Sequence, residues 1–195
     1  MVTQSVRRGF SGLLSIGILA GCGGGGSATL PVASSSIDRP SGYVLTWSDE
    51  FDQGSVLNSD WKYDLGEANF GGSNWGNAEL QYYTSDTANV RLEDGRLAIQ
   101  AVAGKPAGVN LQFGNILATS ARVTTDTPIF YSALGNQPYG YYEIKAQIPC
   151  VGGAWPAIWM MSEKDIYPNQ HNGEMDIMEK LNHDAFAYQT THNHY

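Results

Sequence analysis

The sequence has little cysteine, little positive charge and no recognisable cofactor motif. Its two cysteines, Cys22 and Cys150, have no histidines near them at zinc-binding spacing. No glycine-rich loop stands between a strand and a helix in the pattern that cradles phosphate groups. Lys and Arg number 11 against 19 Asp and Glu, and the net charge of −8 argues against a nucleic-acid partner. We therefore expect no catalytic metal and no nucleotide.

Glycine and aromatic residues are plentiful instead. The chain has 23 Gly, 11 Tyr and 5 Trp, a composition that suits a β-rich protein stacking on flat apolar ligand faces. The segment 89–102 reads as strand, turn and strand around Asp94-Gly95, and 141–148 predicts another strand that ends at Pro149. No long helical period interrupts these runs. The pattern predicts an all-β sandwich.

The first 42 residues are interpreted as targeting and linker segments. Arg7-Arg8 precede an apolar run that is too short to span a bilayer. Leu19-Ala20-Gly21-Cys22 then resembles the lipobox of bacterial lipoproteins, in which the peptide is cut before the cysteine and the cysteine carries the lipids. The alternative is an ordinary secretory signal with a chance cysteine. The Gly-rich and Ser-rich stretch after Cys22 suits a flexible tether.

These features predict three regions: a signal peptide over 1–21, a lipidated Cys22 with its linker over 22–42, and a domain over 43–195. The protein is then expected in a bacterial cell envelope, anchored through lipid in the outer membrane and facing the periplasm or the exterior. If Cys22 carries lipid, Cys150 has no disulfide partner.

The segment 173–179 carries three carboxylates among apolar residues. Alternation from Glu174 to Asp176 predicts a strand, but Glu179 comes one residue later than alternation requires. A β-bulge at Ile177–Met178 absorbs the extra residue and places all three acids on one face. Such a row of like charges is costly, yet a retaining glycosidase needs two carboxyl groups about 5–5.5 Å apart. The alternative is an exposed acidic strand with chance spacing.

The acid motif, preceded by Trp-Pro-Ala-Ile-Trp-Met at 155–160, resembles the catalytic signature of glycoside hydrolase family 16, in its laminarinase and β-glucanase branch. Segments 75–83, 119–123 and 139–143 continue the match in the family's order. The resemblance implies a jelly-roll β-sandwich of the concanavalin A-like type, with a concave sheet that forms the cleft. Family members continue beyond the end of this sequence, so we expect an incomplete sandwich and a fragment or truncated reading frame.

The resemblance also implies roles for individual residues. Glu174 is the nucleophile, Glu179 is the general acid/base, and Asp176 between them modulates the pair. The residues expected to bind substrate are Trp155, Trp159, Asn77, Arg122, Glu79 and Trp75. The alternatives are core aromatic residues, a turn asparagine, an exposed glutamate and a surface Arg–carboxylate pair. His192 lies on the next predicted strand, where it faces either the cleft or a structural partner.

The expected function is that of a monomeric, retaining endo-β-glucanase that cuts β-1,3 or mixed β-1,3/1,4 glucans without a catalytic cofactor. Ser48–Asp52 resembles the family's opening motif, near which some members bind a structural calcium; a solvated acidic turn is the alternative. Other functions stay open. Among enzymes, the chain could be a relative that acts on an agar-type galactan or a transglycosylase. Outside enzymes, it could be a non-catalytic glycan-binding lipoprotein or a truncated, inactive product. Binding-only relatives typically lose an acid, and Glu174 and Glu179 are both intact.

Overall fold

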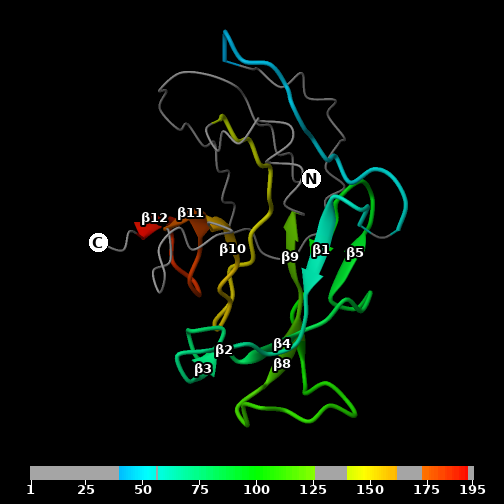
Figure 1. Ribbon diagram of the computed structural model, residues 1–195, viewed down its shortest axis with the longest axis vertical. Helices are drawn as coiled ribbons and strands as arrows, with labels where there is room; N and C mark the ends of the chain where they lie inside the picture. Colours follow the sequence, from blue (N-terminus) through cyan, green and yellow to red (C-terminus); the bar gives the residue numbers. More distant parts are fainter. Residues whose placement is uncertain (1–39, 56, 126–139, 162–172, 193–195) are drawn as a thin grey trace. The chain divides into compact units, whose positions relative to one another are not determined.

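The computed structural model describes residues 40–55, 57–125, 140–161 and 173–192 (Figure 1). The predicted signal peptide, Cys22 and most of the linker lie outside the described residues. The described residues fall into two compact units, Pro40–Lys145 and Ala146–Tyr195, and each is described by itself. Every regular element among them is a strand. The described part of the chain therefore contains no helix with the length and hydropathy of a membrane span.

The described part of the first unit contains nine short strands in four small sheets. The strands are β1 (Trp61–Asp64), β2 (Asn69–Phe70), β3 (Ser73–Asn74), β4 (Gln81–Tyr83), β5 (Val90–Leu92), β6 (Leu97–Ile99), β7 (Val102–Ala103), β8 (Ala118–Ser120) and β9 (Arg122–Thr125). β1 pairs with β9, β2 with β3 and β5 with β6, all antiparallel. β8 lies between β4, to which it is parallel, and β7, to which it is antiparallel.

The predicted hairpin is confirmed at β5 and β6. Glu93 and Arg96 exchange two backbone hydrogen bonds of 3.0 Å around the turn. Asp94 and Gly95 both have positive φ, at 50° and 65°, as a type I′ turn requires. The second strand is shorter than predicted, because Val102 leaves the hairpin and pairs with Thr119 of β8.

The acidic opening segment of the first unit is bonded to protein donors. Asp49 Oδ2 accepts hydrogen bonds from Trp61 Nε1 at 2.8 Å and from Asn58 Nδ2 at 3.2 Å. Asp49 Oδ1 accepts one from the backbone N–H of Phe51 at 2.8 Å. Phe51 is buried, and its ring centroid lies 5.6 Å from that of Trp61. This arrangement gives Asp49 a structural use, and calcium at Ser48–Asp52 stays a prediction.

A long connection between β7 and β8 is tied down by one carboxylate. The two oxygens of Glu67 accept backbone hydrogen bonds from Gln112 at 2.7 Å and from Phe113 at 2.9 Å. Ile116, close to the end of the same connection, is fully buried. The last part of the connection is therefore held to the first unit by two hydrogen bonds and one buried side chain.

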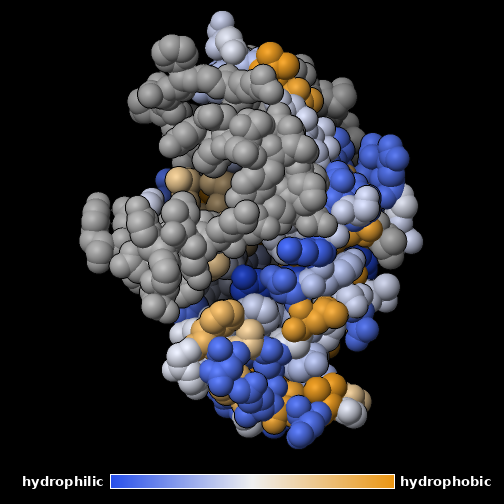
Figure 2. All heavy atoms as spheres, viewed as in Figure 1, coloured by the Kyte–Doolittle hydropathy of each residue, from blue (hydrophilic) through white to orange (hydrophobic). Residues whose placement is uncertain are grey.

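Apolar side chains also lie on the surface of the first unit. Large exposed examples are Leu65, Phe70, Leu80 and Leu117, which are 45–62% exposed. Figure 2 shows orange, apolar spheres beside blue, polar ones on the visible face. Scattered apolar residues of this kind are normal on folded proteins, so their exposure alone marks no binding site.

The strand predicted over Tyr141–Ile148 is wrong. The described residues 140–156 include no strand, although Tyr142 is buried at 6% exposure. A strand needs a neighbour that completes its hydrogen-bond ladder, and no described segment pairs with this one. The alternation of apolar and polar residues over Tyr141–Ile148 therefore does not indicate a strand here.

The second unit is a three-stranded antiparallel sheet. Its strands are β10 (Ala157–Met161), β11 (Glu174–Glu179) and β12 (Tyr188–His192), with β11 in the middle (Figure 1). Ile177, Met178 and Lys180 are buried at 3–5% exposure. The end of β11 is fixed by a backbone hydrogen bond of 3.1 Å from Lys180 N–H to the Pro156 carbonyl. The acid motif therefore lies on the central strand, with neighbours on both sides.

Candidate active site

The predicted bulge in β11 is confirmed. Along β10, Ile158 lies opposite Met178 and Trp159 lies opposite Asp176, so Ile177 has no partner. The register with β12 shifts in the same interval, between Asp176 and Glu179. The strand therefore contains one residue more than either neighbour between its second and third acids.

The bulge places the three acids on one face of the sheet. Residues directly opposite each other in an antiparallel pair share a face. Glu174, Asp176 and Glu179 lie opposite alternate residues of β10, namely Met161, Trp159 and Ala157. They also lie opposite alternate residues of β12, namely His192, Thr190 and Tyr188. Alternate residues of a strand share a face, so both neighbouring strands give the same result.

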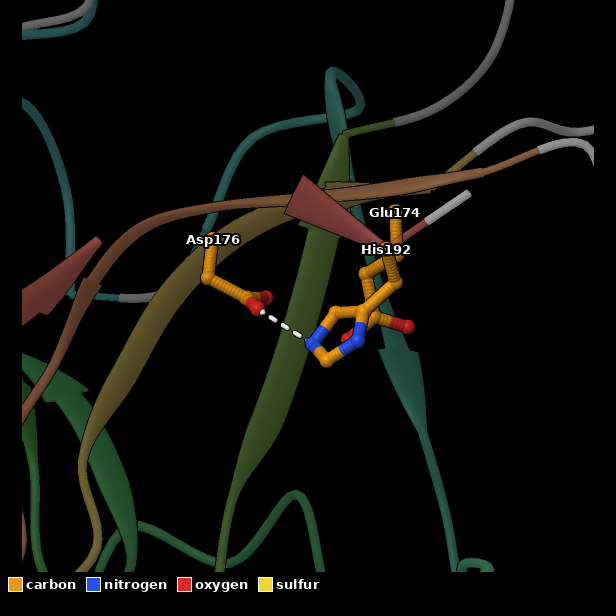
Figure 3. Close-up of side chains that lie close together, drawn as sticks. All are labelled: Glu174, Asp176 and His192. Carbon is orange, nitrogen blue, oxygen red and sulfur yellow. Dashed lines mark ion pairs between the residues drawn. The ribbon is translucent and has the colours of Figure 1, made fainter. Parts of the chain in front are cut away.

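Two of the acids converge with a histidine (Figure 3). His192 lies directly opposite Glu174, and its Nε2 is 3.0 Å from Asp176 Oδ2. The Asp176 side chain is 3% exposed and the His192 side chain is 55% exposed. This contact is an ion-pair distance and not a hydrogen bond, and Asp176 Oδ2 accepts no hydrogen bond from any described residue. Asp176 is thus a buried carboxylate under an exposed imidazole.

Burial raises the pKa of Glu174 above the usual glutamate range, and the charge of Asp176 raises it further. A hydrogen bond with Asp176 and the charge of Glu179 act in the same direction, while the charge of His192 lowers it. These influences together favour the protonated form of Glu174.

The third acid has a different environment. Trp155 donates a hydrogen bond of 2.7 Å from its indole Nε1 to Glu179 Oε1. The Trp155 residue is 47% exposed, so much of its ring remains open to a ligand. Trp159 lies opposite Asp176 on the acid face. Trp155 and Trp159 therefore both lie beside acids of this face, and their role in substrate binding stays a prediction.

Several known proteins of similar sequence are glucan hydrolases. No protein-family model matches the sequence. The β-glucanase of Rhodothermus marinus is 36% identical over 155 residues, which cover 77% of this chain and 48% of that protein. The glucan endo-1,3-β-glucosidase of Cryptopygus antarcticus is 37% identical over 142 residues, or 70% of this chain and 46% of that protein.

A solved structure agrees with the sequence matches. SCLam, a non-specific endo-β-1,3(4)-glucanase from family GH16, matches with a TM-score of 0.63 at 33% identity, over 79% of this chain and 54% of that one. The chain belongs to the laminarinase and β-glucanase branch of glycoside hydrolase family 16. This family-16 chain spans about half the length of these two relatives. The predicted all-β, jelly-roll fold class is confirmed.

The other predicted substrate-binding residues of this family-16 chain belong to the first unit. Arg122 Nε bonds Asp64 Oδ2 at 2.9 Å, and its guanidinium carbon is 4.5 Å from the centre of the Trp75 ring. Trp75 also contacts the ring of Tyr83 edge to face, with centroids 5.3 Å apart. The Arg–carboxylate pair named as an alternative is therefore present, and a role for Arg122 and Trp75 in glycan binding stays a prediction.

Glu79 takes part in a network of internal hydrogen bonds. Its Oε2 accepts from Tyr83 Oη at 3.0 Å and from Gln81 Nε2. Burial raises the pKa of Tyr83, and the negative charge of Glu79 raises it further. Glu79 is half-buried, whereas Asn77 is exposed. The network gives Glu79 a structural use, and its role in glycan binding also stays a prediction.

One contact of the acid face, between His192 and Asp176, involves a residue outside the predicted site. His192 was expected on the following strand, with its direction left open. The sequence feature that could have placed His192 on the acid face is the alternation in β12. The residues opposite the three acids are every second residue of that strand: Tyr188, Thr190 and His192. Their register depends on the turn between β11 and β12, which the sequence pattern alone does not fix.

Proposed function

We propose that the chain hydrolyses β-1,3 or mixed β-1,3/1,4 glucans with retention of configuration, using Glu174 and Glu179. The observation that carries this proposal is the bulge, which brings both glutamates to one face with Asp176 between them. An exposed acidic strand with chance spacing does not explain why Asp176 is buried. The names of the matched relatives supply the substrate class.

The proposed reaction proceeds in two steps. The ionised Glu174 carboxylate attacks the anomeric carbon while Glu179 gives its proton to the departing glycosidic oxygen. Water then attacks the glycosyl–enzyme ester, and Glu179 takes the proton from that water. Trp155 fixes the Glu179 carboxyl through the 2.7 Å hydrogen bond to Oε1. Asp176 and His192 act on Glu174 in opposite electrostatic directions, which sets the pH at which it ionises.

Exposed aromatic surface supports glycan binding next to the acids. Trp155 is 47% exposed and contacts Glu179 through its indole Nε1, and the half-buried Trp159 lies on the acid face of the sheet. Sugar rings present C–H faces that pack on aromatic rings, and Trp gives the largest such surface. We assign both residues to substrate binding, and we add Trp75, Asn77, Glu79 and Arg122 from the family resemblance.

We further propose that Cys22 carries a lipid anchor in a bacterial envelope. The support is the apolar run that ends in Leu19-Ala20-Gly21-Cys22, followed by a glycine-rich tether. A change of Cys22 to Ser is expected to release the protein from the membrane fraction. Continued membrane association of that variant would contradict lipid attachment at Cys22.

Reducing-sugar assays on laminarin, barley β-glucan and agarose test the proposed reaction. Glu174→Gln and Glu179→Gln should each lower the rate on laminarin by at least about 100-fold, because each removes an essential carboxyl group. Glu93→Gln, in the hairpin of the first unit, is the matched control and should keep the rate. The first product should have the β configuration by NMR. Substantial residual activity in both catalytic variants would falsify the assignment.

The same assays separate the alternatives. Hydrolysis of agarose without hydrolysis of either glucan would favour the galactan alternative. Binding of laminarin without release of reducing ends by the unaltered chain would favour the non-catalytic alternative.

A further inference from the structure

Three possible metal ligands meet at one end of the acid face. One ligand atom each from Glu174, Asp176 and His192 lies within 4.8 Å of the others. The register explains the cluster, because Glu174 and Asp176 are two apart on β11 and His192 lies opposite Glu174 on β12. Figure 3 shows the three side chains directed toward one another. The sheet therefore presents two carboxylates and one imidazole as a group.

An unsatisfied buried oxygen points into this cluster. Asp176 has a side chain that is only 3% exposed, and its Oδ2 accepts no hydrogen bond among the described residues. Buried polar atoms are nearly always hydrogen-bonded, because an unpaired one costs free energy. The nearest described group of opposite charge is His192, which offers charge only when protonated. A bound cation would supply a partner for this oxygen.

We propose that Glu174, Asp176 and His192 form a binding site for one transition-metal dication of the Zn²⁺ type, and that this ion competes with the glycan. The donor set selects the class of ion. One imidazole nitrogen and two carboxylate oxygens are common zinc ligands, whereas calcium takes six to eight oxygens. The inhibitory part of this inference rests on the proposed function, and the binding part does not.

The geometry needs only small side-chain movements. Tetrahedral bonds of 2.0–2.2 Å place ligand atoms roughly 3.3 Å apart, somewhat closer than the 4.8 Å limit of the cluster. His192 is exposed and Glu174 is half-buried, so both side chains have room to turn toward Asp176, which burial holds in place. The fourth position of the ion is left for water. A metal-bound Glu174 carboxylate is not available to attack a sugar.

Isothermal titration of the full chain with ZnCl₂ tests the site. We expect one site per chain, and His192→Gln should weaken the affinity by at least about tenfold, since losing even an outer partner of a metal ligand costs that much. Asp176→Asn should weaken it similarly. His183→Gln is the matched control, an exposed histidine of the same unit, and should keep the affinity of the unaltered chain.

Two results overturn the proposal: no zinc binding by the unaltered chain, or equal binding by His192→Gln and His183→Gln. A second titration in the presence of laminarin should show weaker zinc binding, and unchanged binding would overturn the competition.

Zinc titration together with the reducing-sugar assay distinguishes this inference from the proposed function. Hydrolysis of laminarin in the presence of a chelator, without any zinc binding, overturns the metal site and leaves the hydrolase. Zinc binding that depends on His192, by a chain that hydrolyses no glycan, supports the metal site and overturns the hydrolase.

Discussion

The indole N–H of Trp155 bonds the carboxyl oxygen of Glu179 at 2.7 Å. Trp155 precedes β10, and Glu179 ends β11, where it lies opposite Ala157. The bond therefore joins the tryptophan motif to the acid motif at the edge where both strands are anchored by the Lys180–Pro156 backbone hydrogen bond. The two parts of the sequence signature act as one physical unit.

Replacing Trp155 by Phe should lower kcat on laminarin more than it raises KM. The change removes the donor to Glu179 but keeps an aromatic face for the sugar. A hydrogen bond to an ionisable group contributes about 1.5–3 kcal/mol, so we expect a loss of roughly 10- to 100-fold in kcat. Steady-state kinetics of Trp155→Phe and Trp155→Ala separate the two roles, because only the alanine variant also loses the stacking surface. An unchanged kcat in Trp155→Phe would show that the bond does not position the acid.

Deleting Ile177 should leave the three acids on one face. Without this residue, the pairs Asp176–Trp159 and Glu179–Ala157 are joined by an unbroken register. The deletion removes a side chain that is 5% exposed, which should lower the free energy of unfolding by about 2–5 kcal/mol. Measurable hydrolysis with reduced stability is the expected result, checked by reducing-sugar assay and urea denaturation.

Deleting Met175 provides the opposite control. Met175 is 41% exposed, so its removal sacrifices little buried surface. It shifts Glu174 by one position and turns that side chain to the other face of the sheet. This variant should be more stable than the Ile177 deletion and inactive. If the Met175 deletion were active and the less stable Ile177 deletion were inactive, the bulge would not be the feature that aligns the acids.

The acid limb of the pH–rate profile should have its midpoint above the usual pKa range of glutamate. Glu174 must be ionised to attack, and burial together with Asp176 raises its pKa. Asp176→Asn should move the acid limb of kcat/KM to lower pH, and His192→Gln should move it to higher pH, because the His192 charge lowers the pKa of Glu174. Rates on laminarin in the presence of a chelator check both shifts, and a limb that moves in neither variant contradicts this electrostatic coupling.

The raised pKa of Glu174 also affects stability. The folded chain holds this proton more tightly than the unfolded chain does. Glu174 therefore contributes stability at low pH that is lost as the pH rises through its folded-state pKa. Glu174→Gln should remove this part of the pH dependence in urea denaturation.

Asn74 should be essential for the loop that carries Trp75, Asn77 and Glu79. The side chain is 1% exposed, accepts from Ala68 N–H at 3.3 Å, and donates to the carbonyls of Glu79 and Gln81 at 2.9 and 3.1 Å. Asn74→Ala should reduce the free energy of unfolding by roughly 2–3 kcal/mol, because buried backbone groups lose their partners. The exposed Asn77→Ala should change it by less than about 0.5 kcal/mol. Urea denaturation compares the two variants, and equal effects would contradict this role of Asn74.

The sequence contained enough information to predict the acid face. Alternation along a strand predicts the face on which each side chain lies. Asp176 and Glu179 are separated by one residue more than alternation allows, and a bulge places both on the same face. The turn at Asp94-Gly95 was predictable for a similar reason, since it needs residues that tolerate positive φ. Both features leave a signal in the local sequence, which is why they could be predicted without knowing the partner strands.

Features that depend on distant partners were not predictable in the same way. The pattern of Tyr141–Ile148 resembles a strand, yet strand formation depends on a partner that local alternation does not reveal. The contact between His192 and Asp176 depends on how β12 aligns with β11, and the network around Glu79 depends on Tyr83 being half-buried. In each case tertiary structure decides what the local pattern leaves open.

The two hydrogen bonds that Glu67 accepts have a consequence for susceptibility to proteases. A connection of this length normally offers a cleavage site wherever its backbone can unfold locally. Here the backbone at Gln112 and Phe113 is fastened to a residue more than forty positions earlier in the chain. Loss of the Glu67 carboxylate should therefore make the segment before β8 easier to cut, although Glu67 belongs neither to that segment nor to any strand.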